Sequence, residues 1–142
     1  KTPEPTADTW YETGCDLAQT NPEQARDAYR RALALDPHHP DAHVNLGRLL
    51  HEAGHIVAAR EPYSAALTAR PRDATAAFNL GVCFQDLNRP LDAVRAYLRS
   101  LDLDPAQPDA HYNLAQIYQA QGKWARAGHH EQEAERLQHA SP

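Results

Sequence analysis

A repeat with a period of 34 residues runs through the chain. Alanines keep this spacing at Ala25, Ala59, Ala93 and Ala127. Three further series keep it too: Pro37, Pro71 and Pro105; Asn45, Asn79 and Asn113; Leu46, Leu80 and Leu114. A period of this length is typical of two-helix units, which cannot bury their apolar faces alone and must stack on their neighbours. The period therefore restricts the chain to a stack of short helical units.

The second unit shows how one repeat is built. Pro40 suits the first turn of a helix, where its missing N–H is not needed, and apolar residues follow at helical spacing through Asp41–Ala53. Gly54 is expected to end this helix in a left-handed conformation. A second helix is predicted from about Ile56 to Ala69, and Pro71 ends it. Each repeat is therefore predicted to be a helical hairpin.

The first hairpin is one residue shorter than those that follow. Gly14 and Ala25 are 11 residues apart, whereas Gly47 and Ala59 are 12 apart. We therefore expect the first turn, around Thr20–Pro22, to be tighter than the other turns.

Small residues recur where the two helices of a hairpin should meet. They are Gly14, Gly47, Gly81 and Ala115 on the first helices, facing the alanine series on the second helices. Large aromatic side chains, among them Tyr29, Tyr63 and Tyr97, are expected to fill the space beside them. This arrangement predicts closely packed hairpins.

The repeats resemble the tetratricopeptide motif, in which Leu-Gly is followed by an alanine, an aromatic residue and a proline at fixed offsets. The matching residues of the second and third units are Leu46-Gly47, Ala59, Tyr63 and Pro71, then Leu80-Gly81, Ala93, Tyr97 and Pro105. The fourth unit departs from the motif, with Glu131 at the aromatic position and His139 at the proline position. Its polar ending is interpreted either as a cap or as degeneration before another domain.

The resemblance, which covers about residues 6–141, implies an all-α fold, a right-handed α-solenoid of four helix-turn-helix repeats. The predicted repeats span about residues 6–39, 40–73, 74–107 and 108–141. They are expected to form one domain over residues 1–142, with residues 1–5 flexible. His43–Gly54 and Ala74–Pro90 are also loosely similar to repeats that follow MerR-like domains in bacterial regulators, but no DNA binding is inferred from this.

In such repeats the first helices line a concave groove, so the resemblance places Asn45, Asn79 and Asn113 there. A carboxamide offers one acceptor and two donors, and can therefore bind a peptide group whatever its side chain. We expect this series to bind the backbone of an extended segment. The alternative is that the asparagines only hydrogen-bond neighbouring helices.

The same face is predicted to carry further binding residues. Val44, Phe78 and Tyr112 occupy equivalent positions and either contact an apolar ligand side chain or pack between repeats. Arg48, Gln85 and Gln116 are predicted to complete the peptide-binding groove. The lysines of a chaperone-type carboxylate clamp are missing, because Val44, Phe78 and Tyr112 stand at a lysine position of that clamp. Acidic residues such as Asp41 and Asp86 favour a neutral or basic partner.

Composition excludes several classes of partner. The formal net charge is −5, which argues against nucleic acid or an anionic membrane surface, and no apolar run approaches the length of a membrane span. The two cysteines, Cys15 and Cys83, are expected to stay unpaired, which favours a reducing, cytoplasmic compartment. The chain begins at Lys1 and contains no methionine, so we expect a piece of a longer protein.

The sequence from His51 to His55 matches the H-E-x-x-H motif of zinc proteases. That chemistry needs both histidines on one face of a continuous helix. Because the repeat places Gly54 in a turn, we expect the helix to end before His55 and no metal site to form. No cofactor or catalytic residue is predicted.

The sequence therefore predicts a non-catalytic module that binds an extended peptide or a partner segment, neutral to basic, in its groove. The alternative is a self-association scaffold within a larger regulatory protein, in which Trp124 is a candidate contact.

Overall fold

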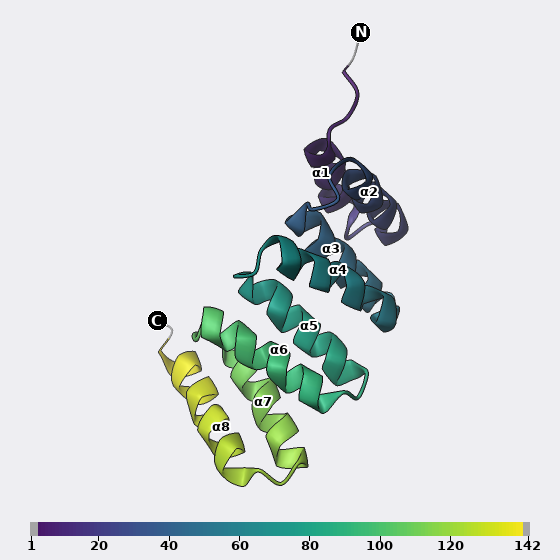
Figure 1. Ribbon diagram of the computed structural model, residues 1–142. Coiled ribbons are helices and arrows are strands. Elements are labelled where there is room, and N and C mark those ends of the chain that lie inside the picture. The colour runs from purple at the N-terminus through teal and green to yellow at the C-terminus, as the bar shows by residue number, and fades with distance from the viewer. Residues whose placement is uncertain (1–2, 141–142) are drawn as a thin grey trace. The chain divides into compact units, whose positions relative to one another are not determined.

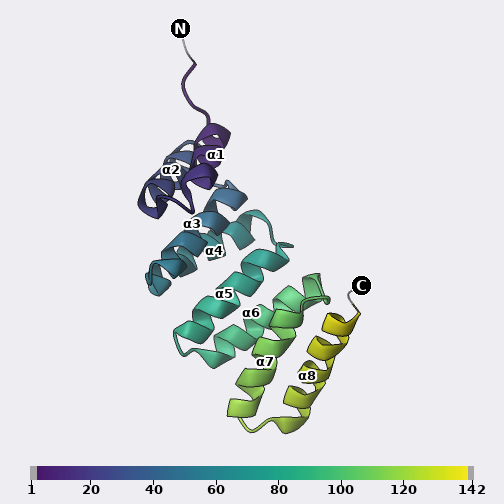
Figure 2. The same ribbon diagram turned by 180° about the vertical axis from the view of Figure 1, so that it is seen from behind.

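The computed structural model describes residues 3–140, and their regular secondary structure is entirely α-helical (Figures 1 and 2). The chain divides into two compact units, unit 1 up to Arg72 and unit 2 from Asp73. Unit 1 contains α1 (Ala7–Leu17), α2 (Pro22–Leu35), α3 (Pro40–Glu52) and α4 (Ile56–Ala69). Unit 2 contains α5 (Ala74–Asp86), α6 (Pro90–Leu103), α7 (Pro108–Ala120) and α8 (Trp124–His139). The predicted all-α fold is confirmed.

Each unit is a pair of stacked hairpins. The helices pack as α1 with α2 and α3 with α4 in unit 1, and as α5 with α6 and α7 with α8 in unit 2. The second helix of one hairpin then packs on the first helix of the next, α2 on α3 and α6 on α7. Whether residues 1–142 form one domain stays a prediction. The predicted flexibility of residues 1–5 partly concerns residues 1–2, outside the described residues, and residues 3–5 have no regular structure.

The helix boundaries follow from local chemistry. Pro22, Pro40, Pro90 and Pro108 open their helices, where no amide hydrogen is needed. Side chains before several helices accept a hydrogen bond from a first-turn amide, as Asp73 does from the amide of Ala76 at 3.0 Å. The start of each hairpin is therefore specified by a short local sequence.

Three of the four hairpin turns contain a residue with a left-handed backbone. Gly54 has φ 87°, Asn88 has φ 57° and Gly122 has φ 73°. In each turn the next amide bonds back to a carbonyl five residues earlier, as from His55 to Leu50 at 2.8 Å. The predicted left-handed end at Gly54 is confirmed.

The turn between α1 and α2 reverses the chain direction with a different backbone conformation. Residues 18–21 separate α1 from α2, whereas three residues separate the helices of each other hairpin. The amide of Asn21 bonds to the Leu17 carbonyl at 2.8 Å, and the turn contains no left-handed residue. The prediction of a tighter first turn is therefore wrong. The helix α1 is two residues shorter than α3, with 11 residues against 13, and the turn is one residue longer, which together give the net loss of one residue.

Each of the first three hairpins packs a tyrosine ring directly on a first-helix glycine. A Cβ atom added to Gly14, Gly47 or Gly81 would lie 2.5, 2.8 or 2.7 Å from the ring of Tyr29, Tyr63 or Tyr97. All three tyrosines are at most 2% exposed. The predicted role of the glycines is confirmed, because a Cβ atom at these positions would overlap the ring unless the ring or the helix shifted.

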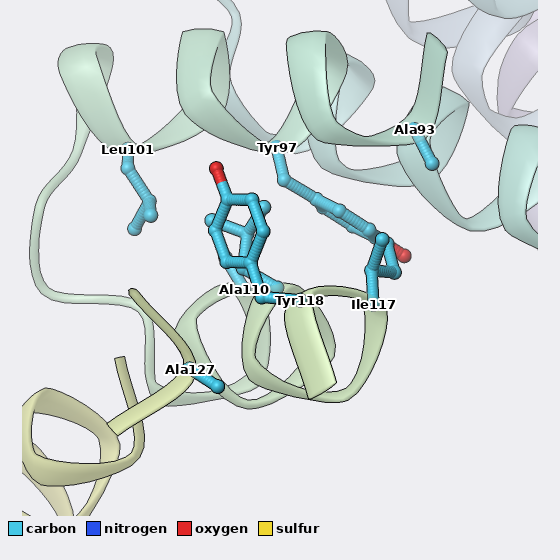
Figure 3. Packing of buried hydrophobic residues seen from close by; sticks show 8 residues of the cluster. Ala93, Tyr97, Leu101, Ala110, Ile117, Tyr118 and Ala127 are labelled. Atoms are coloured by element: carbon cyan, nitrogen blue, oxygen red, sulfur yellow. The ribbon is translucent and has the colours of Figure 1, made fainter. Parts of the chain in front are cut away.

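The core of unit 2 lies where α6, α7 and α8 meet. Tyr97 extends from α6 toward Ile117 on α7, and Tyr118 extends back toward α6 (Figure 3). Ala110 and Ala127 complete this layer from α7 and α8. Buried packing therefore holds α7 firmly, so its outer face can present side chains in fixed positions.

Candidate functional site

The predicted binding residues lie on the first helices of the hairpins and are shared between the two units. Val44, Asn45 and Arg48 lie on α3 of unit 1. The others lie in unit 2: Phe78, Asn79 and Gln85 on α5, and Tyr112, Asn113 and Gln116 on α7.

In unit 1 the carboxamide of Asn45 is held between α1 and α3. Its Nδ2 donates to the Tyr11 hydroxyl at 3.2 Å and to Cys15 Sγ at 3.7 Å. Its Oδ1 accepts from the guanidinium of Arg48 at 3.0 Å. Asn45 therefore links two helices, which supports the alternative that these asparagines serve packing, and Arg48 covers the oxygen that a peptide amide would need.

A cavity of about 390 Å³ opens beside this network, between the C-terminal ends of α1 and α3. We call it the unit 1 cavity. Its lining residues include Asp16, Ala18, Asn45, Arg48, Leu49 and Glu52. Two of the predicted site residues, Asn45 and Arg48, thus line one hollow.

Burial changes the acidity of the tyrosines near the unit 1 cavity. It raises the pKa of Tyr11 to about 12, and the neighbouring Cys15 contributes to the rise. Burial also raises the pKa of Tyr29, whose hydroxyl donates to Cys15 Sγ at 3.5 Å. Both hydroxyls therefore stay protonated at neutral pH and act as hydrogen-bonding groups.

In unit 2 three predicted residues are anchored by tyrosines. Asn113 Nδ2 donates to the Tyr97 hydroxyl at 3.2 Å, and that hydroxyl donates to Gln85 Oε1 at 2.7 Å. Gln116 Nε2 donates to the Tyr112 hydroxyl at 3.2 Å. Unlike Asn45, Asn113 keeps its Oδ1 without a hydrogen bond to another described residue, so this oxygen can accept one from a ligand.

A second cavity, of about 300 Å³, lies between the C-terminal ends of α5 and α7. We call it the unit 2 cavity. It is lined by Gln85, Asn88, Pro90, Gln116, Ile117, Ala120 and Gln121. The structure thus brings together Gln85 and Gln116, two of the predicted residues.

The three residues of the apolar row have different environments. Val44 is buried, at 7% exposed, which favours its role in packing. Phe78 is half-buried against the unit 2 core, with its ring 5.6 Å from that of Tyr97. Tyr112 is 54% exposed and available to a ligand. Asn79 is half-buried on α5, and its carboxamide makes no hydrogen bond to another described residue of unit 2.

The two cavities occupy equivalent positions in the repeat. Arg48, Leu49 and Glu52 of unit 1 correspond to Gln116, Ile117 and Ala120 of unit 2, 68 residues later. Leu49, Ile117 and Gln121 were not among the predicted site residues. The repeat could have pointed to them, because cavity-lining positions recur, but only the structure shows that the hollow lies at the ends of the first helices.

The two histidines of the H-E-x-x-H match do not lie on one continuous helix. α3 ends at Glu52, and His55 lies at the start of α4, beyond the left-handed Gly54. The prediction that the helix ends before His55 is confirmed. Among residues 3–140, no three His, Cys, Asp or Glu side chains gather in a geometry that could hold a metal ion.

Two histidines that are distant in the sequence, His111 and His130, are in contact in the structure. His111 Nδ1 and His130 Nδ1 lie 2.9 Å apart between α7 and α8, and His111 Nε2 donates to the Pro105 carbonyl at 3.2 Å. Burial and the proximity of His111 and His129 lower the pKa of His130 to about 4. At neutral pH His130 is therefore uncharged, and its Nδ1–H donates to His111 Nδ1.

Two further findings bear on cellular context. Neither Cys15 nor Cys83 forms a disulfide with another described residue. In the described part of the chain, none of the helices combines the length and apolar character that a membrane span requires.

Three family models match the chain. A tetratricopeptide repeat model matches residues 16–74, a TPR repeat model matches 91–122, and a second tetratricopeptide repeat model matches 110–135. Together they cover more than half of the sequence. The chain belongs to the tetratricopeptide repeat family. No protein with a curated description matches this tetratricopeptide chain in sequence.

Solved structures share the tetratricopeptide fold. A crystal structure of MamA is 19% identical, with a TM-score of 0.89 over 94% of this chain and 78% of its own. MamA of Desulfovibrio magneticus RS-1 is 23% identical, with a TM-score of 0.86 over 95% and 77%. PilF of Pseudomonas aeruginosa is 22% identical, with a TM-score of 0.87 over 93% and 61%. At these identities the likeness establishes the fold alone.

Proposed function

We propose that this tetratricopeptide chain is a non-catalytic protein–protein interaction module that binds an extended peptide or partner segment along its first helices. The observation that carries the proposal is the recurrence of one cavity in both units. Each cavity lies at the C-terminal ends of two successive first helices and includes predicted binding residues. A hollow repeated with the helices suits a ligand that is itself repetitive, such as a polypeptide.

The chemistry around the cavities suits a peptide. Carboxamides of Asn113, Gln85 and Gln116 lie on the first helices of unit 2, and each offers both donor and acceptor atoms. Tyrosine hydroxyls hold one end of each carboxamide, so the remaining polar atom has a fixed direction. Preorganised amide groups bind a peptide backbone with less loss of side-chain entropy than free ones.

The charge on the first helices favours a neutral or basic segment. α5 and α7 contain Asp86 and Asp109 but neither lysine nor arginine, and α1 contains three acidic residues and no basic one. Complementary charge steers association and specificity more than it adds affinity. The same negative balance disfavours nucleic acid and anionic membranes as partners. Two cysteines outside any disulfide, Cys15 and Cys83, favour a cytoplasmic setting for the module.

The proposal is tested by selecting binders from a library of short random peptides displayed on phage. Selected peptides are synthesised and titrated by calorimetry against the chain and against Gln116→Ala, which removes an exposed carboxamide at the unit 2 cavity. We expect binding to weaken about tenfold. The matched control is Arg95→Ala, an exposed residue of the second helix α6 that should leave the affinity unchanged. The proposal is contradicted if the affinity of the selected peptides falls in Arg95→Ala but not in Gln116→Ala.

Exposed apolar residues in unit 2 favour self-association as a second candidate. Trp124 is 70% exposed at the start of α8, and Leu91 is 65% exposed on α6. Light scattering over a range of concentrations tests this function. A mass that rises with concentration in the native chain and stays monomeric in Trp124→Ser supports it, whereas a constant mass contradicts it.

A further inference from the structure

The two cavities share a floor but differ in the charge around it. At the equivalent floor position stand Leu49, 5% exposed, and Ile117, 6% exposed. Around them, Glu52 corresponds to Ala120 and Arg48 to Gln116. The buried apolar residue is thus repeated in both cavities, whereas the charged residues are found only in the unit 1 cavity. Each cavity therefore offers different chemical groups to a side chain that enters it.

The unit 1 cavity carries excess negative charge. Asp16 and Glu52 line it, both exposed, and neither carboxylate forms an ion pair or a hydrogen bond with a described residue. The opposing cation, Arg48, points a guanidinium nitrogen at Asn45 Oδ1, 3.0 Å away. Two carboxylates against one guanidinium leave a net charge of −1 around the hollow. Unpaired carboxylates above an apolar floor suit a side chain with a long aliphatic stem and a cationic end.

The unit 2 cavity is uncharged. None of the residues that line it is Asp, Glu, Lys, Arg or His. Pro90, Ile117 and Ala120 supply apolar surface, and the other lining residues carry carboxamides. A charged side chain entering this hollow would lose hydration without gaining an opposite charge, whereas an apolar one would gain burial.

We propose that the two cavities select different side chains of the bound segment. The unit 1 cavity accepts lysine or arginine, and the unit 2 cavity accepts an uncharged, apolar side chain. This inference rests on the proposed function, since it assumes a polypeptide partner, and it adds which residue classes that partner presents to each unit.

The test uses three small probes: N-acetyl-arginine, N-acetyl-glutamate and N-acetyl-leucine methylamides. Each is titrated into the isotope-labelled chain while backbone amide NMR signals are followed at Thr20 and Glu52 for unit 1, and at Ala120 and Gln121 for unit 2. We expect the arginine probe to occupy the unit 1 cavity with about threefold higher affinity than the other two, since exposed ion pairs contribute little. The leucine probe should prefer the unit 2 cavity, and added salt should weaken only the arginine probe.

An exchange of equivalent residues sharpens the test. In the double variant Glu52→Ala, Ala120→Glu, the preference for the arginine probe should move from the unit 1 signals to those of unit 2. Glu4→Gln removes the same charge before α1 and should leave the native preference in place. Circular dichroism of each variant checks that the helices are intact.

The inference is overturned if arginine and glutamate probes titrate the unit 1 signals equally, if the exchange moves no preference, or if neither cavity responds to any probe. The peptides selected on phage separate this failure from that of the proposed function. Peptides weakened by Gln116→Ala but indifferent to the exchange overturn the inference alone. Peptides that perturb neither cavity overturn the proposed function.

Discussion

At the level of single residues, the contact between a first-helix glycine and a second-helix tyrosine sets how closely each hairpin packs. In the fourth hairpin Ala115 stands at the glycine position, and Glu131 stands where the ring would be. Gln119 Nε2 then bonds to Glu131 Oε1, at the positions where Gln85 Oε1 accepts from Tyr97. The small residue and the ring thus change together, which indicates that the space is shared between them.

This contact predicts opposite effects for two glycine-to-alanine changes in unit 2. Gly81→Ala should lower the free energy of unfolding by about 1–3 kcal/mol, because its Cβ would overlap the Tyr97 ring. Gly128→Ala should raise it by about 0.5–1 kcal/mol, because a Cβ there meets no atom within 4 Å and alanine favours the helix. Urea denaturation of both variants measures the two values. Equal effects would show that the ring moves aside at little cost.

At the level of elements, the helices were largely predictable and the side-chain contacts between them were not. Gly54 and Pro71 predicted the ends of α3 and α4, because both residues act through local backbone geometry. The first turn was mispredicted, because a one-residue deletion can shorten either a turn or a helix, and local sequence does not decide which. The partner of Asn45 could not be predicted either, since the Tyr11 hydroxyl reaches it only once α1 packs on α3.

The pairing of His111 with His130 was missed for the same reason. The equivalents of His130 are Pro62 and Ala96, so the repeat gives no sign of a partner at this position. In the second hairpin, His43 corresponds to His111, and its Nδ1 is buried without a hydrogen bond to any described residue. The His130 side chain thus satisfies an atom that is left unpaired in the second hairpin.

This pair predicts a pH-dependent stability for unit 2. Folding lowers the pKa of His130 from 6.5 to about 4. Between these two pH values the His130 side chain is protonated in the unfolded chain but not in the folded chain. The contribution of His130 to the free energy of unfolding is therefore fully present above pH 6.5 and is lost as the pH falls toward 4. His111 and His129 oppose the charge on His130, whereas Glu133 favours it.

Thermal unfolding at pH 7.5 and pH 5.5 measures this dependence. The melting temperature should fall more between these pH values in the native chain than in His130→Ala, which places the residue of the third hairpin at this position. His38→Ala, an exposed residue before α3, is the control and should retain the native difference. An unchanged difference in His130→Ala would contradict the assignment.

At the level of the whole molecule, burial is distributed unevenly within each unit. α3 has six buried residues, whereas α1 has only Gly14; α7 has six, whereas α8 has Ala127 and Ala134. Local opening is easiest where few side chains are buried. We therefore expect α1 to open before α3, and α8 to open before α7.

Hydrogen exchange under native conditions checks this order. Amides in the middle of α3 should exchange at least about tenfold more slowly than those of α1, and amides of α7 more slowly than those of α8. Uniform protection would mean that α1 opens only together with α3, and α8 only together with α7. The comparison is made inside each unit, so that it does not depend on how the units are arranged.

The glycine–tyrosine contact also constrains the order in which a hairpin can change during evolution. A hairpin that passes from the form of Gly81 and Tyr97 to that of Ala115 and Glu131 needs two separate mutations. If the alanine arises first, its Cβ overlaps the ring, and the intermediate is destabilised by overpacking. If the tyrosine is lost first, the intermediate has a gap that the later alanine partly fills. The two orders of mutation therefore pass through intermediates of different stability. Selection for stability would favour one order over the other.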